Sequence, residues 1–261
     1  MAPPAIAPDG NRRERFRDKG GKIISDIWKT SEYRVNKNAW TRALRLKPAP
    51  GGPTDGDTLN SVLSWQTEKD QCWVCKRHLN DDPNKCGQQC YDWWREQGPQ
   101  GRLDNDCEIR PLPWNSGFKG HGVYLKEWTP GGAKMPSITR SDMVGEYVGE
   151  LVPCDREDHE YGGEAEGRYI FEGPDQRWLI DAGKWGNSSR FINHNCRPNL
   201  IAIPVVVGGR RLITFRALKA IKAGEELTIH YGESYFNRYH EKCRCNALGR
   251  PVAHDPEPAP R

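Results

Sequence analysis

The chain has 261 residues, of which 36% are hydrophobic and 28% are charged, and its formal net charge is +4 at pH 7. This length suits one large domain, or a catalytic domain with a small satellite. No run approaches 18 uninterrupted apolar residues and the N-terminus lacks the apolar segment of a secretory signal, so we expect neither a membrane span nor export. The small net charge does not by itself indicate a nucleic-acid binder.

Charge is distributed unevenly along the chain. Residues 12–22 carry six basic side chains against two acidic ones, and residues 155–166 carry six acidic side chains against one basic. The first run predicts an arm that contacts DNA or chromatin or acts as a nuclear import signal, with a merely solvated surface as the alternative. The second predicts a loop that attracts a basic polypeptide, and a solvated acidic loop is again the alternative.

The first 70 residues divide into an arm and a helical region. Residues 1–20 are rich in Pro and Arg with almost nothing to bury, which predicts a flexible basic arm. From Ile23 the apolar positions have roughly helical spacing, so residues 21–70 are predicted to be helical around a Pro/Gly-dense linker at 47–57. Asp57 is then predicted to cap a short helix.

Nine cysteines, an odd number, are expected to be reduced because no export signal precedes them. Within residues 71–107, a Cys-x2-Cys pair is followed by a Cys-x3-Cys pair. Two such pairs supply the four soft ligands of a tetrahedral zinc at little loop-closure cost. The spacing predicts one structural zinc, with His78 as a substitute ligand and buried free thiols as the alternative interpretation. The predicted ligands are Cys72, Cys75, Cys86 and Cys90.

Short apolar runs separated by glycines fill residues 108–240. They are rich in Val, Ile and aromatic residues, which favour strands. We therefore predict a mostly β domain with short helices. The predicted strands are 122–125, 144–148, 169–171, 178–180, 200–207, 212–215 and 227–231. The segment after Gly249 is predicted to be a disordered tail.

Five short motifs follow one another in this half of the chain. They are GEYVGEL at 145–151, RYIF at 168–171, IDA at 180–182, GNSSRFINHNCRPN at 186–199 and GEELTIHYG at 224–232. Each is weak alone, but in this order and spacing they resemble the SET-domain histone lysine methyltransferases over residues 108–245. The resemblance implies the β-clip SET fold with its pseudoknot, with zinc-organised flanks. These flanks are a pre-SET-like segment at 71–107 and a post-SET-like segment with a disordered tail at 241–261.

The resemblance implies that S-adenosylmethionine binds between a Gly-x-Gly turn and an Asn-His turn. Glycines let the backbone approach a ligand closely, and an Asn side chain offers both a donor and an acceptor. His121 stands where the family usually has Trp or another large side chain. The residues to which the resemblance gives a cofactor-binding role are Gly120, His121, Gly122, Arg190, Phe191, Asn193, His194 and Tyr231.

The resemblance also implies direct in-line methyl transfer to a neutral lysine amine. An aromatic channel beside a cationic sulfonium lowers the pKa of that lysine, so no dedicated base is required. Tyr231 matches the tyrosine that orients the amine. Tyr147 and Tyr169 match aromatic walls of the channel, with ordinary strand packing as the alternative. Ile229 replaces the Phe or Tyr common in the family, which predicts that multiple methylation is not blocked.

A second zinc stays open at this point. Cys196, Cys243 and Cys245 match three of the four thiols of the family's C-terminal zinc site, but Arg250 stands in the fourth position. Three thiolates leave a tetrahedral zinc one ligand short. His254, Cys107 or water completes the site, or the site is empty.

Two classes of function follow. The first is an S-adenosylmethionine-dependent protein-lysine methyltransferase acting on a histone or other basic tail, in the nucleus on the chromosome or in the cytoplasm. The second is a catalytically silent SET module that binds peptide or chromatin. A methyl-lysine reader or a zinc-finger adaptor would leave the Gly-x-Gly and Asn-His turns without a purpose. The target lysine and the oligomeric state stay undetermined.

Overall fold

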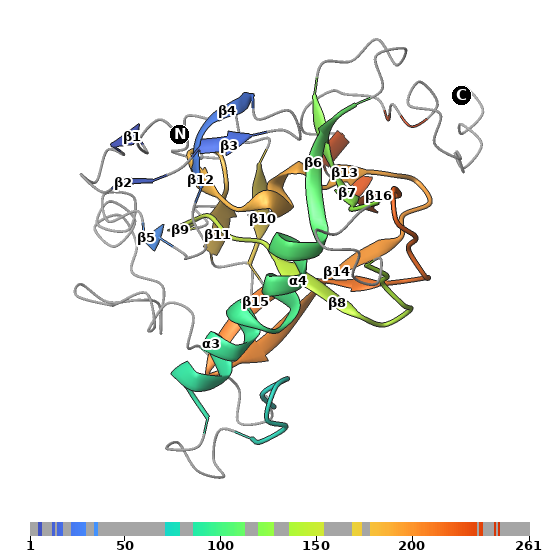
Figure 1. Cartoon of the computed structure of the whole chain (residues 1–261). Helices are drawn as coiled ribbons and strands as arrows, with labels where there is room; N and C mark the ends of the chain where they lie inside the picture. The colour runs from blue at the N-terminus through green and yellow to red at the C-terminus, as the bar shows by residue number, and fades with distance from the viewer. Residues whose placement is uncertain are drawn as a thin grey trace, which may run out of the picture.

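The computed structural model of this chain describes residues 5–6, 12–13, 15–17, 22–29, 34–35, 71–78, 86–112, 120–127, 136–153, 169–173, 178–233, 235–236, 243 and 245 (Figure 1). Strands predominate in the described part, which confirms the mostly β prediction. The predicted acidic loop at 155–166, the linker at 47–57 and the tail lie outside the described residues. No helix in the described ranges is long and apolar enough to cross a membrane.

One sheet brings distant parts of the chain together in the order β13-β16-β7-β6. Its inner pair, β16 and β7, is antiparallel, and β13 joins β16 in parallel with Asn193 opposite Thr228. The Gly-x-Gly turn that opens β7 and the Asn-His pair of β13 are therefore held by the same sheet. The strands are β6 (Cys107–Pro111), β7 (His121–Leu125), β13 (Asn193–His194) and β16 (Glu226–Ile229).

A hairpin of β14 (Leu200–Val207) and β15 (Arg210–Ala217) forms the centre of a second sheet with β8 (Met143–Glu146). Its two-residue turn is Gly208-Gly209, and both residues have positive φ, as a tight hairpin turn requires. Val, Ile and Leu fill most of β14, and β15 buries Leu212, Ile213 and Phe215, so the predicted strands at 200–207 and 212–215 are confirmed.

A third sheet has the order β10-β11-β9-β5, and a smaller one has the order β12-β4-β3. In both, an N-terminal strand pairs in parallel with a strand of the domain: β5 with β9, and β4 with β12. The first 35 residues therefore add strands to the domain. The strands are β3 (Arg15–Arg17), β4 (Ile23–Lys29), β5 (Arg34–Val35), β9 (Glu150–Pro153), β10 (Ile170–Glu172), β11 (Trp178–Asp181) and β12 (Trp185–Gly186). A separate pair is β1 (Ala5–Ile6) with β2 (Arg12–Arg13).

The helical prediction is wrong for Ile23–Lys29, which is the strand β4. Two β-branched residues begin this segment, and such residues favour strands. The backbone of β4 also finds partners on both sides, in β3 and β12. Tertiary pairing therefore overrides a weak helical periodicity. The short helix expected after Asp57 lies outside the described residues.

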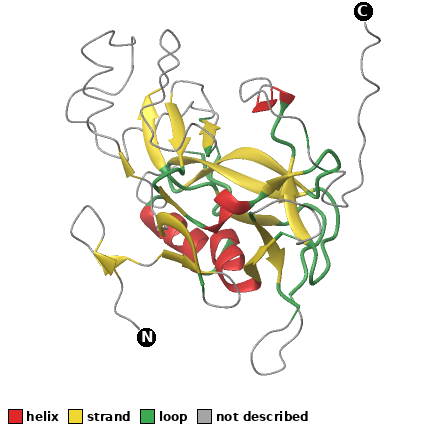
Figure 2. Ribbon diagram, turned by 90° about the horizontal axis from the view of Figure 1, so that it is seen from above, coloured by secondary structure: helices red, strands yellow, loops and turns green. Residues whose placement is uncertain are grey.

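Two α-helices lie at and after Cys90 of the second cysteine pair, where the sequence indicated metal organisation rather than a core. Figure 2 shows them together beside the strands, and they are α3 (Gln88–Glu96) and α4 (Pro99–Asp106). Helix α3 buries Cys90, Tyr91 and Trp94 on one face, and α4 begins at a proline, which suits the first turn. Helix α4 packs so closely on β8 that a Cβ on Gly145 would lie 2.4 Å from Leu103 Cδ2.

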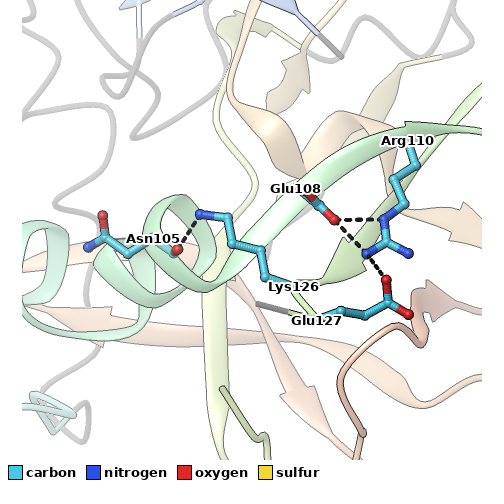
Figure 3. A network of polar contacts seen from close by, with 5 residues as sticks. All are labelled: Asn105, Glu108, Arg110, Lys126 and Glu127. Atoms are coloured by element: carbon cyan, nitrogen blue, oxygen red, sulfur yellow. Dashed lines mark hydrogen bonds and ion pairs between the residues drawn. The ribbon is translucent and has the colours of Figure 1, made fainter. Parts of the chain in front are cut away.

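The buried apolar side chains of the described residues form a continuous core, and the largest fully buried ones among them are Trp94, Trp178, Tyr91 and Phe215. At the edge of β6, polar contacts tie the end of α4 to the end of β7 (Figure 3). Arg110 donates from Nε to Glu108 at 2.7 Å and also contacts Glu127 at 3.2 Å, while Lys126 donates to the Asn105 carbonyl. Glu127 is exposed, so these pairs contribute little stability.

Candidate functional site

The Gly-x-Gly turn and the Asn-His turn meet at the end of the first sheet. Asn193 Nδ2 donates to the His121 carbonyl at 3.0 Å and to Glu226 Oε1 at 2.9 Å. A Cβ on Gly122 would lie 2.5 Å from Glu226 Oε1 and 3.1 Å from Asn193 Nδ2, so only glycine allows this approach. The structure therefore brings the two motifs into direct contact, with a carboxylate between them that the sequence had not singled out.

Arg190 and Phe191 lie on the 3-10 helix η3 (Ser188–Phe191), which Asn187 caps by accepting from the Ser189 amide. Arg190 is buried, donates from Nε to the Ala182 carbonyl at 2.9 Å, and places its guanidinium 3.7 Å from the Tyr169 ring centroid. Burial lowers the pKa of Arg190, yet Arg retains its charge in proteins. A fixed positive charge thus lies against one wall of the candidate site.

The Phe191 ring has two aromatic neighbours. One is His121, with ring centroids 6.4 Å apart, and the other is Phe16 of β3, at 5.2 Å in an edge-on arrangement. Phe16 is buried although it belongs to the predicted flexible arm. The N-terminal segment therefore reaches the candidate cofactor-binding residues, which no local sequence pattern indicated.

The three candidate tyrosines are each held by a hydrogen bond or a stacked partner. Tyr231 donates its hydroxyl to the Ile192 carbonyl at 2.9 Å, and Tyr147 donates to the Tyr169 carbonyl at 2.7 Å. Burial raises the pKa of Tyr147 well above its ordinary value; the nearby Arg190 opposes this rise and Tyr231 adds to it. The Tyr147 hydroxyl is therefore neutral at physiological pH, and backbone carbonyls fix both hydroxyls. Ile229 is buried on β16, two residues before Tyr231.

The N-terminal thiol cluster consists of Cys72, Cys75, Cys86 and Cys90, whose sulfur atoms all lie within 4.8 Å of one another. Zinc–sulfur bonds in a tetrahedron separate sulfurs by about 3.8 Å, so the four thiols fit this metal. Burial opposes ionisation of Cys72, yet backbone hydrogen bonds led by the Gly208 amide lower its pKa to about 7. Such amides stabilise a thiolate, the form that binds metal.

The C-terminal thiol cluster gathers Cys196, Cys243 and Cys245 beside His194. The sulfurs of Cys196 and Cys243 are 3.2 Å apart, and His194 Nε2 is 3.4 Å from Cys196 Sγ. Of the completing ligands considered from sequence, Cys107 lies on β6 opposite Leu125, and His254 is outside the described residues. The structure instead brings up His194, to which the sequence gave a cofactor role alone.

The hydrogen bonds of His194 decide its role in this cluster. Its Nδ1 accepts from the Tyr231 amide at 3.1 Å. A neutral imidazole has one N–H and one lone pair, so accepting at Nδ1 places the proton on Nε2. That nitrogen then donates to Cys196 Sγ and has no lone pair for a metal. With this tautomer the described residues offer three thiolates to a zinc and His194 orients one of them, so a tetrahedral site still needs a fourth ligand.

A family model for the SET domain matches residues 135–232. The chain carries a SET domain. The match contains the three tyrosines, η3, the Asn-His pair and Cys196, whereas the Gly-x-Gly turn and the N-terminal thiol cluster precede it and Cys243 and Cys245 follow it. Sequence motifs alone had indicated this family.

The SET domain is similar to parts of larger proteins. The Schizosaccharomyces pombe histone-lysine N-methyltransferase, H3 lysine-4 specific, is 43% identical over 101 residues, 37% of this chain and 11% of that protein. Human histone-lysine N-methyltransferase EHMT1 is 35% identical over 122 residues, 43% of this chain and 9% of that protein. Arabidopsis thaliana histone-lysine N-methyltransferase ASHH2 is 27% identical over 197 residues, 68% of this chain and 11% of that protein. The chain thus spans about a tenth of these relatives' length.

A solved structure of polycomb repressive complex 2 from Chaetomium thermophilum aligns with 49% of this chain and 15% of that chain, at 28% identity and a TM-score of 0.36.

Proposed function

We propose that this chain is an S-adenosylmethionine-dependent protein-lysine N-methyltransferase that acts on a histone-like basic tail. The observation that carries the proposal is the convergence of the motifs on one place: Asn193 donates to the His121 carbonyl of the Gly-x-Gly turn, and Tyr231 is anchored to the Ile192 carbonyl, next to Asn193 in the chain. The relatives named histone-lysine N-methyltransferases support the reaction and the substrate class. A nuclear location follows from that substrate, with the cytoplasm as the alternative.

The residues at the turn fit the amino-acid end of S-adenosylmethionine. This end carries an ammonium and a carboxylate, so it needs acceptors and donors side by side. Glu226 supplies a carboxylate 2.9 Å from Asn193 Nδ2, and the absence of a side chain on Gly122 lets this carboxylate lie directly against the backbone of the turn. His121, Phe191, Arg190 and His194 flank this place and complete the proposed cofactor-binding set. When bound, the cofactor supplies an electrophilic methyl group on a positively charged sulfur.

Tyr231 orients the amine in the proposed reaction. Because its hydroxyl proton is given to the Ile192 carbonyl, its oxygen presents lone pairs to any N–H that enters the site. The Tyr147 hydroxyl donates its hydrogen bond to the Tyr169 carbonyl. Tyr147 and Tyr169 therefore form a wall of the site that offers the amine no competing hydroxyl donor. A neutral amine with its N–H on Tyr231 has its lone pair directed away, as in-line attack requires.

Arg190 assists by disfavouring the protonated substrate. Its guanidinium stacks on Tyr169 at 3.7 Å, and nearby positive charge lowers the pKa of a lysine. Burial of the aromatic wall acts in the same direction, because desolvation penalises an ammonium. The chain therefore needs no carboxylate base near the amine, and the neutral nucleophile is selected by the environment.

We propose zinc at both thiol clusters, with a structural role in each. The N-terminal site is closed by four thiolates, as structural zinc sites are. The C-terminal site offers three thiolates beside Tyr231, so its metal would hold the end of the chain against the active site. The contact of the arm with DNA or chromatin rests on charge alone. Of the arm, β1, β2 and β3 are described.

Calorimetry with S-adenosylmethionine followed by labelled methyl transfer to core histones tests the proposed function. We expect Tyr231→Phe to bind the cofactor like the wild type but to lose about 100-fold or more in kcat, because it removes the group that orients the amine. Tyr235→Phe is the matched control, since Tyr235 stacks on Tyr231 at 4.7 Å. Peptide binding without transfer by the wild type would favour the catalytically silent module instead.

Ile229 bears on how many methyl groups the proposed reaction adds to the lysine. An aliphatic side chain cannot hold a water in the amine pocket by a hydrogen bond, so room remains for a methylated amine. We expect mass spectrometry of the peptide product to show dimethyl or trimethyl lysine at saturating cofactor, and Ile229→Tyr to shift it toward monomethyl. Only monomethyl lysine from the wild type would contradict this expectation.

A further inference from the structure

A buried carboxylate lies directly before the wall residue Tyr147. Glu146, the last residue of β8, is 0% exposed. Its Oε1 accepts from the Tyr91 hydroxyl at 3.1 Å, and its Oε2 accepts from Trp94 Nε1 at 3.0 Å. Tyr91 and Trp94 are three residues apart on α3, so one helix face presents both donors to one carboxylate. A buried charge held by two directed donors resists displacement.

The same helix carries a ligand of the N-terminal thiol cluster. Cys90 is adjacent to Tyr91 in α3, and Trp73, between Cys72 and Val74, packs edge-on against Trp94 with ring centroids 5.3 Å apart. The Trp73 amide also donates to the Val206 carbonyl of β14 at 2.7 Å. Both halves of the cluster are therefore fixed to the aromatic pair that holds Glu146.

The backbone of Glu146 is held from two further directions. Its amide donates to Gln100 Oε1 of α4 at 2.9 Å, and its carbonyl accepts from Asn187 Nδ2 at 2.8 Å. Asn187 caps η3, the element that carries Arg190 and Phe191. All four polar atoms of Glu146 thus have partners, which come from α3, from α4 and from Asn187, the cap of η3. A shift of α3 would move this residue and, with it, Tyr147 and the cap of η3.

We propose that Glu146 is a positioning residue that couples the metal state of the N-terminal thiol cluster to the placement of Tyr147 and η3. The catalytic part of this inference rests on the proposed methyltransferase function. With metal bound, Cys90 fixes α3, and α3 fixes Glu146 through Tyr91 and Trp94. Without metal, α3 loses that anchor, and Tyr147 and η3 become more mobile. The N-terminal metal thereby supports turnover from outside the active site.

Hydrogen exchange measured by mass spectrometry tests the coupling without relying on activity. Glu146→Gln keeps the shape of the side chain but turns its N–H₂ group toward one of the two donors, Tyr91 or Trp94. We therefore expect the rate of amide hydrogen exchange in residues 143–152 to rise about tenfold with metal still bound. Cys75→Ser, which empties the N-terminal cluster, should raise exchange in the same segment. The double variant, Glu146→Gln with Cys75→Ser, should raise the exchange rate little beyond either single variant, because both changes break the same connection between the cluster and Tyr147. Tyr91→Phe is a milder second variant that removes one donor.

Kinetics separate positioning from general destabilisation. We expect Glu146→Gln to lower kcat about tenfold while the KM for S-adenosylmethionine changes less than about threefold and the metal content is unchanged. Asp92→Asn, a change on α3 at a residue that contacts Gln88, is the control and should leave both readouts alone. Unchanged exchange and kcat in Glu146→Gln, or additive effects in the double variant, would overturn the inference. A wild type that transfers no methyl group contradicts the proposed function, while the exchange experiment still decides the role of Glu146.

Discussion

The two thiol clusters use similar ligands but stand in different relations to the candidate active site. The N-terminal cluster has four thiols from two short pairs and is connected to Tyr147 indirectly, through α3 and Glu146. The C-terminal cluster has three thiols from segments far apart in sequence, and His194 links it directly to Tyr231 and Cys196. The first is a self-contained structural unit, whereas the second exists only when the end of the chain meets the Asn-His turn.

This difference predicts that the two clusters have different roles. A cluster whose ligands are close in sequence forms with little loss of chain entropy and stabilises the elements around it. A cluster that joins residues 47 and 49 positions apart, as Cys196 does with Cys243 and Cys245, fixes a tertiary contact next to the reacting groups. The N-terminal metal should therefore dominate stability, and the C-terminal metal should dominate activity.

The largest effect expected is loss of stability when the N-terminal metal is removed. Cys86→Ser should lower the Tm by at least about 10 °C, since metal binding at a structural site is part of the folding free energy. The matched Cys243→Ser should lower the Tm less but reduce methyl transfer more. Scanning calorimetry, metal analysis and transfer assays on both variants check this. Equal losses of Tm in Cys86→Ser and Cys243→Ser would contradict the predicted difference between the two clusters.

A smaller effect is expected at His194. His194→Asn can still accept from the Tyr231 amide but no longer donates to Cys196 Sγ, so metal affinity at the C-terminal cluster should fall about 10–100-fold. Because His194 is not a ligand in this arrangement, the absorption spectrum of the cobalt-substituted cluster should keep its three-sulfur character. Complete loss of this metal, or a spectrum that loses a nitrogen ligand, would instead make His194 a ligand.

A further effect concerns pH. Burial raises the pKa of Glu146 to about 7, although Tyr91, Trp94, Arg95 and Arg210 oppose this rise. The folded state therefore holds a proton that the unfolded state releases above pH 4.5, so stability falls as pH rises from about 4.5 to 7 and is level above that. This contribution is at most about 3 kcal/mol. Glu146→Gln should remove it, as denaturant unfolding at several pH values would show; an identical pH slope in the variant would contradict the assignment.

Sequence patterns predicted the strands of the SET domain because each pattern is local. The runs at 200–207 and 212–215 are β14 and most of β15, and the predicted strand at 178–180 lies within β11. The helical spacing after Ile23 misled, because the backbone of β4 pairs with two strands, one of them more than 150 residues away in sequence. Helices α3 and α4 were not predicted, because their segment has few aliphatic residues. Helix α3 is packed by the aromatic residues Tyr91 and Trp94 in place of aliphatic ones.

The candidate site also has features that the sequence predicted and features that it did not. The spacing of Cys72, Cys75, Cys86 and Cys90 predicted their grouping, and the SET motifs predicted that Gly122 and Asn193 would be neighbours. Glu226 stood within a motif already singled out but had no assigned role, and its contact with Asn193 is the signal that assigns one. Nothing local indicated that Phe16 would pack on Phe191.

The sequence by itself determined the SET domain and the grouping of the four N-terminal thiols, because these depend on residue types at short, fixed spacings. Only the tertiary structure decided that His194 lies beside Cys196 as a donor, that Glu146 joins α3 to Tyr147, and that the N-terminal strands extend the domain. Each of these contacts joins residues whose proximity depends on sheet pairing and burial. Such proximity arises from the packing of the whole core and leaves no periodic signal in the chain.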